Sequence, residues 1–130
     1  PNRYYFVDLS EDVIEINTVI LREIGIEPYG YVSDISDIER DIIRKHYQYI
    51  FLWKTIPVLE KIDKKLPYNL LSVLDFDYLV VSFSQKSLGK MRGIGRYWRY
   101  WIKKVSNRLG YKIVKEFDIP YEFFVVIKRS

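Results

Sequence analysis

Two acidic residues directly follow apolar, strand-like runs, where their carboxylates could bind a nucleotide. Asp8 follows the run 3–7 (RYYFV), and Asp34 follows the run 29–33 (YGYVS). Ligands in open α/β sheets bind beyond the carboxyl ends of the strands, where an acid can accept two hydrogen bonds from a ribose diol. Asp8 could thus hold a ribose, and Asp34 could meet the amino group of an adenine ring. In the alternative interpretation, each carboxylate only caps the helix or loop that follows it.

A second chemical signal is a run of cations without acids. Residues 78–115 contain ten of the chain's 21 Lys and Arg residues and no Asp or Glu, although the formal net charge of the whole chain is only +4. Tyrosines and tryptophans are interleaved with the cations, as in surfaces that neutralise phosphates and stack on bases. We expect RNA to contact Lys86, Lys90, Arg92, Arg96 and Arg99. The alternative for these cations is a solvated helix face. Trp98 and Trp101 lie on the apolar stripe of the helix, so we expect both in the core.

Residue sets for other chemistries are missing from the sequence. It has no cysteine and one histidine, His46, which is expected to be solvated at a helix end. There is thus no Ser-His-Asp triad, and neither a metal cluster nor a pair of catalytic carboxylates is recognisable. The glycines of residues 89–95 do not form a dinucleotide-binding loop. Lys54, which follows a buried run, either faces a ligand or begins a surface helix.

The elements that would position these residues alternate along the chain. Strands are expected over residues 3–8, 29–33, 47–53, 78–84, 111–117 and 121–128. Helices are expected from Ser10 to Ile24, from Ser36 to about Lys45, from Lys54 through Ile62, and over residues 68–74 and 94–109. This alternation predicts an α/β fold with a mostly parallel sheet and an antiparallel C-terminal strand. Residues 1–130 read as a single domain.

Composition excludes a membrane-spanning protein. Of the 130 residues, 48% are hydrophobic and 29% are charged, which are values of globular chains. No window lacks charge over the roughly 18 residues that a membrane span requires. No secretory signal is visible at the start of the sequence, so we expect a cytoplasmic protein.

Four segments together resemble a known family, the aminoglycoside-resistance 16S ribosomal RNA (guanine-N7) methyltransferases. They are Tyr5–Ser10 (YFVDLS), Tyr49–Glu60 (YIFLWKTIPVLE), Val80–Gly89 (VVSFSQKSLG) and Ile119–Ile127 (IPYEFFVVI). The second and third segments are the most specific. The first and fourth are generic to S-adenosylmethionine-dependent folds.

This resemblance implies a Rossmann-like class I methyltransferase sheet and S-adenosyl-L-methionine as the cofactor. It implies that Asp8 holds the ribose, and that Asp34 and Ile35 frame the adenine. Leu52, Trp53 and Lys54 would lie beside the methionine part and the target base. The implied partner is ribosomal RNA or the 30S subunit. Because guanine N7 carries a lone pair, methyl transfer can rest on positioning alone, so no catalytic acid or base is expected.

The sequence departs from the family at one essential feature. The family's first strand and glycine-rich loop, roughly Gly-x-Gly-x-Asn-Pro, are not found here, nor is its N-terminal helical domain. Our hypothesis is that the chain is the C-terminal part of an incomplete catalytic domain, completed by the rest of the same protein or by another chain. The first alternative is a non-catalytic RNA-binding module or an inactive fragment of such an enzyme. The second is a nucleotide-binding oxidoreductase. The oxidoreductase would need the same loop with a different spacing.

Overall fold

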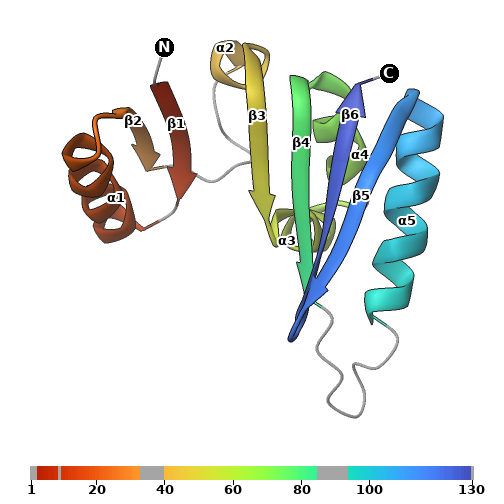
Figure 1. Cartoon of the computed structure of the whole chain (residues 1–130). Helices are drawn as coiled ribbons and strands as arrows, with labels where there is room; N and C mark the ends of the chain where they lie inside the picture. Colours follow the sequence, from red (N-terminus) through yellow and green to blue (C-terminus); the bar gives the residue numbers. More distant parts are fainter. Residues whose placement is uncertain (1–2, 9, 33–39, 85–93, 130) are drawn as a thin grey trace. The chain divides into compact units, whose positions relative to one another are not determined.

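The computed structural model describes residues 3–8, 10–32, 40–84 and 94–129. The chain forms two compact units, Pro1–Ile42 and Ile43–Ser130. Figure 1 labels their elements. The two units are described separately below, as unit 1 and unit 2.

Unit 1 is a parallel strand pair with one long helix. Strand β1 (Arg3–Asp8) pairs with β2 (Glu27–Val32), so that Asp8 lies opposite Val32 at the carboxyl end. Helix α1 (Glu11–Glu23) connects them and begins at Ser10, whose hydroxyl accepts a hydrogen bond from the backbone N–H of Val13 at 3.3 Å. Short helix α2 (Arg40–Ile43) follows at the boundary of the units. The strand–acid–helix order predicted from the sequence is confirmed.

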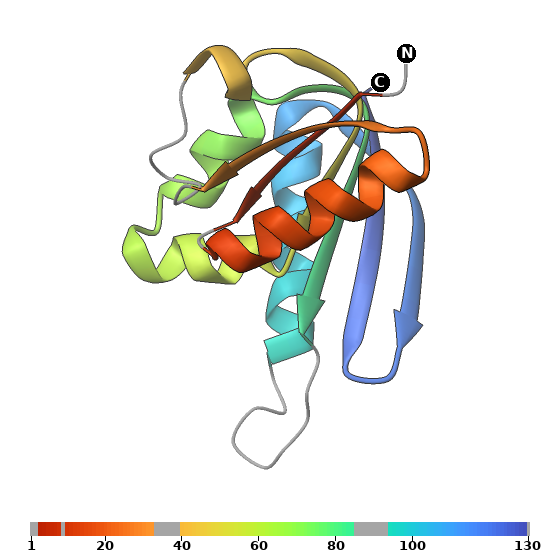
Figure 2. The ribbon, with the colours of Figure 1, turned by 90° about the vertical axis from the view of Figure 1, so that its left-hand side faces the viewer.

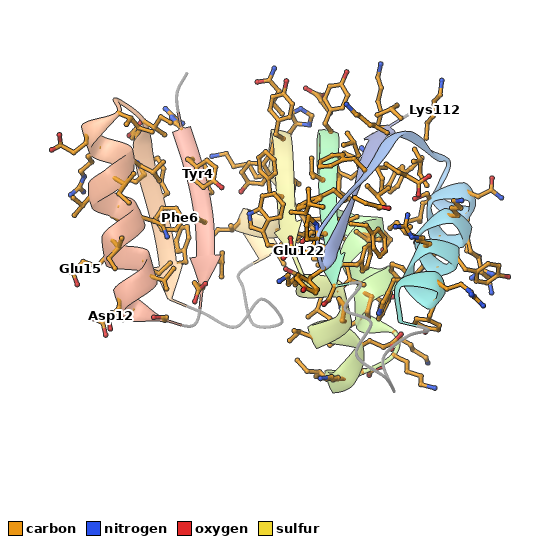
Figure 3. All side chains as sticks on the ribbon, turned by 60° about the horizontal axis from the view of Figure 1, so that its bottom comes forward. Tyr4, Phe6, Asp12, Glu15, Lys112 and Glu122 are labelled. Carbon is orange, nitrogen blue, oxygen red and sulfur yellow. The ribbon has the colours of Figure 1, made fainter. Side chains whose placement is uncertain are left out.

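Helix α1 lies against the strand pair without forming a buried core. At Gly30 of β2 a Cβ atom would come within 2.7 Å of both Ile14 and Phe6, so glycine permits the close approach of helix and strand. The acidic side chains of Asp12 and Glu15 point away from the strands in Figure 3, and Figure 2 shows α1 lying along them. None of the described side chains of residues 3–31 is buried. Several apolar side chains of α1 are exposed: Val13, Ile16, Val19 and Ile20.

Unit 2 is a four-stranded sheet in the order β3-β4-β6-β5. Strands β3 (His46–Trp53) and β4 (Asp75–Ser84) are parallel, whereas β6 (Glu122–Arg129) is antiparallel to both β4 and β5 (Tyr111–Ile119). The expected antiparallel end of the sheet is therefore confirmed. Strand β4 begins earlier than the predicted Tyr78, because Asp75 and Phe76 pair with the first residues of β3.

Three helices cover one face of this sheet and enclose the core: α3 (Thr55–Ile62), α4 (Leu66–Val73) and α5 (Ile94–Leu109). Phe83 of β4 stacks on Trp98 of α5 and on Phe123 of β6, at centroid distances of 5.4 and 5.0 Å. The other buried side chains of this core include Leu52, Ile56, Leu59, Leu71, Leu79, Val81, Ile102, Val125 and Ile127. The prediction that Trp98 belongs to the core is confirmed, whereas Trp101 is only half-buried.

The opposite face of the sheet carries a row of aromatic rings. Phe51 stacks on Trp53 at 5.6 Å, Trp53 meets the ring of Phe124 edge-on at 5.6 Å, and Phe124 stacks on Phe117 at 4.9 Å. Trp53 is 56% exposed, and Phe51 and Phe117 are exposed as well. Since the three described helices of unit 2 that pack on its sheet lie on the other side, we call this surface the open aromatic face.

Candidate functional site

Asp8 ends β1 as an exposed carboxylate with one local hydrogen bond. Its Oδ1 accepts the backbone N–H of Ser10 at 2.8 Å, while the Ser10 hydroxyl caps α1. Asp8 thus takes part in the turn that leads into the helix, as the capping interpretation expected. Its exposed position at the carboxyl end of a parallel strand also suits a ligand with donor groups, such as a ribose diol.

The carboxyl end of β3 holds a backbone corner with an unusual conformation. Lys54 has a φ of 51°, in the left-handed region, and directly precedes α3. Its backbone N–H donates to both the carbonyl oxygen of Ser82 at 3.2 Å and the hydroxyl of Ser82 at 2.9 Å. Ser82 is buried, so β4 holds the corner in place. A residue other than glycine in this conformation costs of order 1–2 kcal/mol and is common at ligand sites.

The side chains at this corner differ in what they leave open to a ligand. Trp53 lies exposed on the open aromatic face, while the side chain of Leu52 is buried in the core and leaves mainly its backbone to a ligand. The Lys54 ammonium forms an ion pair with Glu122, the first residue of β6, which Figure 3 labels. The Lys54 side chain is therefore paired with a carboxylate of the same chain. Glu122 is a neighbour of the site that the sequence did not indicate.

A second left-handed residue adjoins Glu122. Tyr121 has a φ of 70° and follows Pro120 in the two-residue turn between β5 and β6. Proline followed by a positive-φ residue is the pattern of a type II turn, in which glycine or asparagine is preferred at the position Tyr121 holds. Left-handed residues therefore lie at both ends of the Lys54–Glu122 ion pair: Lys54 itself, and Tyr121 directly before Glu122.

Helix α5 carries the two described members of the predicted RNA surface. Arg96 is exposed. Arg99 is partnered within the chain: its guanidinium donates to the carboxylate of Asp118 at 2.6 Å and lies 4.2 Å above the ring of Phe123. Arg99 therefore fastens α5 to β5 and β6 as well as being a candidate for RNA contact.

The remaining predicted site residues lie outside the described residues. These are Asp34 and Ile35 of the cofactor set, and Lys86, Lys90 and Arg92 of the RNA set. Their roles stay predictions. Asp8 belongs to unit 1, whereas Trp53 and Lys54 belong to unit 2. The structure therefore describes Asp8 separately from the other two residues.

His46 has a defined role that the sequence did not indicate. It begins β3, with Nδ1 at 3.0 Å from Asp75 and Nε2 at 3.4 Å from Asp77. The hydrogen bond to Asp75 raises the pKa of the imidazole, and both nearby negative charges act in the same direction. Its side chain is 53% exposed, so the expected solvated position is confirmed, although His46 begins a strand instead of ending a helix. Both acids belong to β4, far from His46 along the chain, so the sequence did not indicate their contact with it.

Comparison with solved structures identifies the fold. An rRNA methylase from Escherichia coli superposes with a TM-score of 0.76 over 99% of this chain, at 17% identity. The 16S rRNA methyltransferase RmtF, in complex with S-adenosyl-L-homocysteine, gives 0.73 over 97% at 22% identity. The 16S rRNA methylase ArmA gives 0.70 over 98% at 20% identity.

This chain has the fold of the 16S rRNA methylases. It is the α/β fold of class I methyltransferases, as other matches also show, among them a magnesium protoporphyrin IX methyltransferase from Synechocystis with a TM-score of 0.61. The resemblance that the four sequence segments indicated is thus confirmed at the level of the fold. The chain spans 49% of the E. coli methylase, 47% of RmtF and 62% of ArmA.

The sequence itself matches no family model and no curated protein. Among the described helices, none has the length and apolar character needed to cross a lipid bilayer.

Proposed function

We propose that this chain is part of an S-adenosyl-L-methionine-dependent RNA methyltransferase that acts on a guanine N7 of small-subunit ribosomal RNA. The observation that carries the proposal is the superposition of 97–99% of the chain on three rRNA methylases. The four sequence segments point to the same family independently of the structure. The guanine-N7 position rests on these segments alone.

The proposed cofactor site consists of Asp8, Asp34, Ile35, Leu52, Trp53 and Lys54. The described members fit the cofactor chemically, because Asp8 offers an exposed carboxylate for a ribose and Trp53 an exposed aromatic surface. The strained backbone at Lys54 is held by Ser82, as expected of a corner that must keep its shape when a ligand binds. The bound cofactor would supply a methyl group on a sulfonium. The protein would supply position and exclude water.

The proposed RNA surface consists of Lys86, Lys90, Arg92, Arg96 and Arg99. Cations such as the exposed Arg96 attract the phosphate backbone and provide salt-dependent affinity, while Arg99 also forms its ion pair with Asp118. With a ribosomal substrate, we propose that the protein acts in the cytoplasm.

We further propose that units 1 and 2 belong to one catalytic domain that other residues complete, from the same protein or from another chain. Three observations support this. The chain spans 49% of the E. coli methylase and 47% of RmtF. Among the described residues, unit 1 buries no side chain. Unit 2 exposes Phe51 and Trp53 on the open aromatic face, and a large exposed apolar patch commonly marks an interface.

The second candidate function is a non-catalytic RNA-binding module. It is favoured by one observation: the basic helix α5 is well formed, whereas the sequence holds no glycine-rich loop for the methionine end of the cofactor.

Calorimetry with S-adenosyl-L-methionine separates the two functions, using the complete protein that contains a glycine-rich loop, or this chain mixed with a polypeptide that supplies it. We expect binding, and transfer of a labelled methyl group to 30S subunits. Asp8→Asn keeps an oxygen for the Ser10 N–H but loses the carboxylate charge, so we expect at least tenfold weaker cofactor binding. Asp12→Asn, on the first turn of α1, is the matched control. Absence of cofactor binding with intact RNA binding would establish the RNA-binding module instead.

A further inference from the structure

A cavity between α4 and α5 belongs to neither of the proposed sites. Its volume is about 380 Å³, within the usual range for small-molecule sites. Six of the residues that line it carry the inference: Lys64, Lys65, Tyr68, Trp101, Lys104 and Arg108. They come from the turn before α4, from the first turn of α4 and from successive turns of α5.

The rim of this cavity is cationic. Lys64 and Lys65 approach from one side and Lys104 and Arg108 from the other, and no carboxylate lines the cavity. None of these four forms an ion pair with a carboxylate of the described residues. The nearest acid in sequence, Asp63, uses Oδ1 to accept the backbone N–H of Lys65 at 2.9 Å. Four cations without an internal counter-ion form a site for an anion.

The walls of the cavity are aromatic. Tyr68 and Trp101 are both half-buried, and Trp101 is fixed by an edge contact with the core residue Trp98 at 5.5 Å. The guanidinium of Arg108 lies 5.9 Å from the centre of the Tyr68 ring. Exposed aromatic surfaces beside cations are what proteins use to stack a base while neutralising its phosphate.

The cavity lies on a different flank of α5 from Arg99. Arg99 points to β5, where it binds Asp118, whereas Trp101, Lys104 and Arg108 face α4. A favourable interaction with the C-terminal carbonyls of α5 would explain Arg108 in the last turn, but it would not explain the lysines on the α4 side.

We propose that this cavity binds one nucleotide of a single-stranded RNA segment. The base stacks against Tyr68 and Trp101, and the phosphate is neutralised by Lys64, Lys65, Lys104 and Arg108. The inference rests on the proposed function, because it takes RNA as the substrate class, and it adds a second point of RNA contact on the other flank of α5.

The test measures binding of a labelled single-stranded RNA of about eight nucleotides to the full chain by fluorescence anisotropy, over a range of salt concentrations and without cofactor. The double variant Lys104→Gln/Arg108→Gln is expected to weaken binding at least tenfold. It should also lower the slope of log affinity against log salt by about 0.7, which corresponds to the loss of one phosphate contact on a single strand. Tyr68→Leu is expected to weaken binding about tenfold with an unchanged slope. Lys103→Gln, also exposed on α5 but outside the lining, is the matched control.

Ultraviolet crosslinking followed by mass spectrometry gives a readout that does not depend on affinity, and we expect RNA adducts on the peptides that contain Tyr68 or Trp101. Far-ultraviolet circular dichroism checks that each variant is folded. Equal affinity and slope for the double variant and Lys103→Gln would overturn the proposal. So would binding of guanosine monophosphate or inorganic phosphate at this cavity without binding of RNA.

The two proposals fail in different ways. If the complete protein binds no S-adenosyl-L-methionine while the cavity variants still weaken RNA binding, the methyltransferase function is wrong and the cavity proposal holds. If methyl transfer occurs but the cavity variants bind RNA normally, the cavity proposal alone is wrong.

Discussion

At the scale of single residues, the structure assigns structural roles to several side chains that the sequence marked only by charge. Arg99 joins α5 to Asp118, Lys54 joins the end of β3 to Glu122, and His46 joins β3 to β4. Their residue types were visible in the sequence, but their partners lie far away along the chain. A pattern search that looks only at neighbours along the sequence cannot find such pairs.

His46 should make the stability of the protein depend on pH. Its pKa is raised in the folded state, first by the hydrogen bond to Asp75. The protonated imidazole therefore stabilises the fold fully below the unfolded pKa of about 6.5, and this contribution is lost as the pH rises through the folded pKa. We expect His46→Gln to lower the melting temperature more at about pH 5.5 than at about pH 8.5. Thermal denaturation at both pH values measures this, and an equal loss at both would contradict it.

Arg96 and Arg99 should separate RNA binding from stability. We expect Arg96→Ala to weaken RNA binding and to reduce the salt slope by about 0.7 for a single strand, with little effect on stability. Arg99→Ala should weaken RNA binding too, but it should also lower the free energy of unfolding by about 1 kcal/mol, because Asp118 and the Phe123 ring lose their partner.

Asp118→Asn is the matched control for Arg99. It should reproduce the loss of stability in urea titrations without weakening RNA binding. A salt slope that does not change in either arginine variant would exclude direct phosphate contacts by these two residues.

Tyr121 should be replaceable with a gain in stability. Its left-handed backbone costs of order 1–2 kcal/mol relative to glycine, and its side chain is 67% exposed. After allowing for the greater entropy of glycine in the unfolded chain, Tyr121→Gly should raise the free energy of unfolding by about 0.5–1 kcal/mol. Tyr121→Val should lower it, since a β-branched residue tolerates this conformation least. Urea denaturation of both variants tests the argument, and equal effects would refute it.

At the scale of elements, apolar patterns, caps and breakers in the sequence predicted every described helix and strand, but their exact ends depend on partners. The early start of β4 follows from the pairing of Asp75 with His46, which no pattern within β4 reveals. The first turn of the helix expected from Ser36 lies outside the described residues, and Arg40–Ile43 is helical as expected. The cavity could not be predicted either, because its lining comes from two separate segments, the start of α4 with the turn before it and α5, which the fold brings together.

Gly30 is the residue on which the packing of α1 against β1 and β2 depends. A methyl group there would meet Ile14 and Phe6 at 2.7 Å, and both contacts are too short. We expect Gly30→Ala to destabilise unit 1 by about 1–3 kcal/mol, because steric conflict outweighs the better strand propensity of alanine. Val19→Ala, on the exposed side of α1, should change stability by less than about 0.5 kcal/mol. Circular dichroism during urea denaturation compares the two, and a neutral Gly30→Ala would show that the helix can move away.

At the scale of the whole molecule, the α/β class and the antiparallel end of the sheet could be predicted from the sequence. The division into two units could not. Each predicted strand was consistent with one continuous sheet, whereas β1 pairs with β2 and β3 pairs with β4 in separate sheets. The complete cofactor set draws on both units, so its assembly remains part of the proposed function.

The lack of a buried side chain among the described residues of unit 1 has a consequence for amide hydrogen exchange. Local opening is governed by the buried apolar contacts that it breaks, so the two units should behave as separate cooperative exchange units. We expect the backbone amides of β1 and β2 to exchange faster than those of β4 and β6. Amides of β4 and β6, around Phe83 and Phe123, should be protected to the level of global unfolding. If further residues complete the domain as proposed above, the protection of β1 should rise when they bind, and deuterium uptake would report this directly.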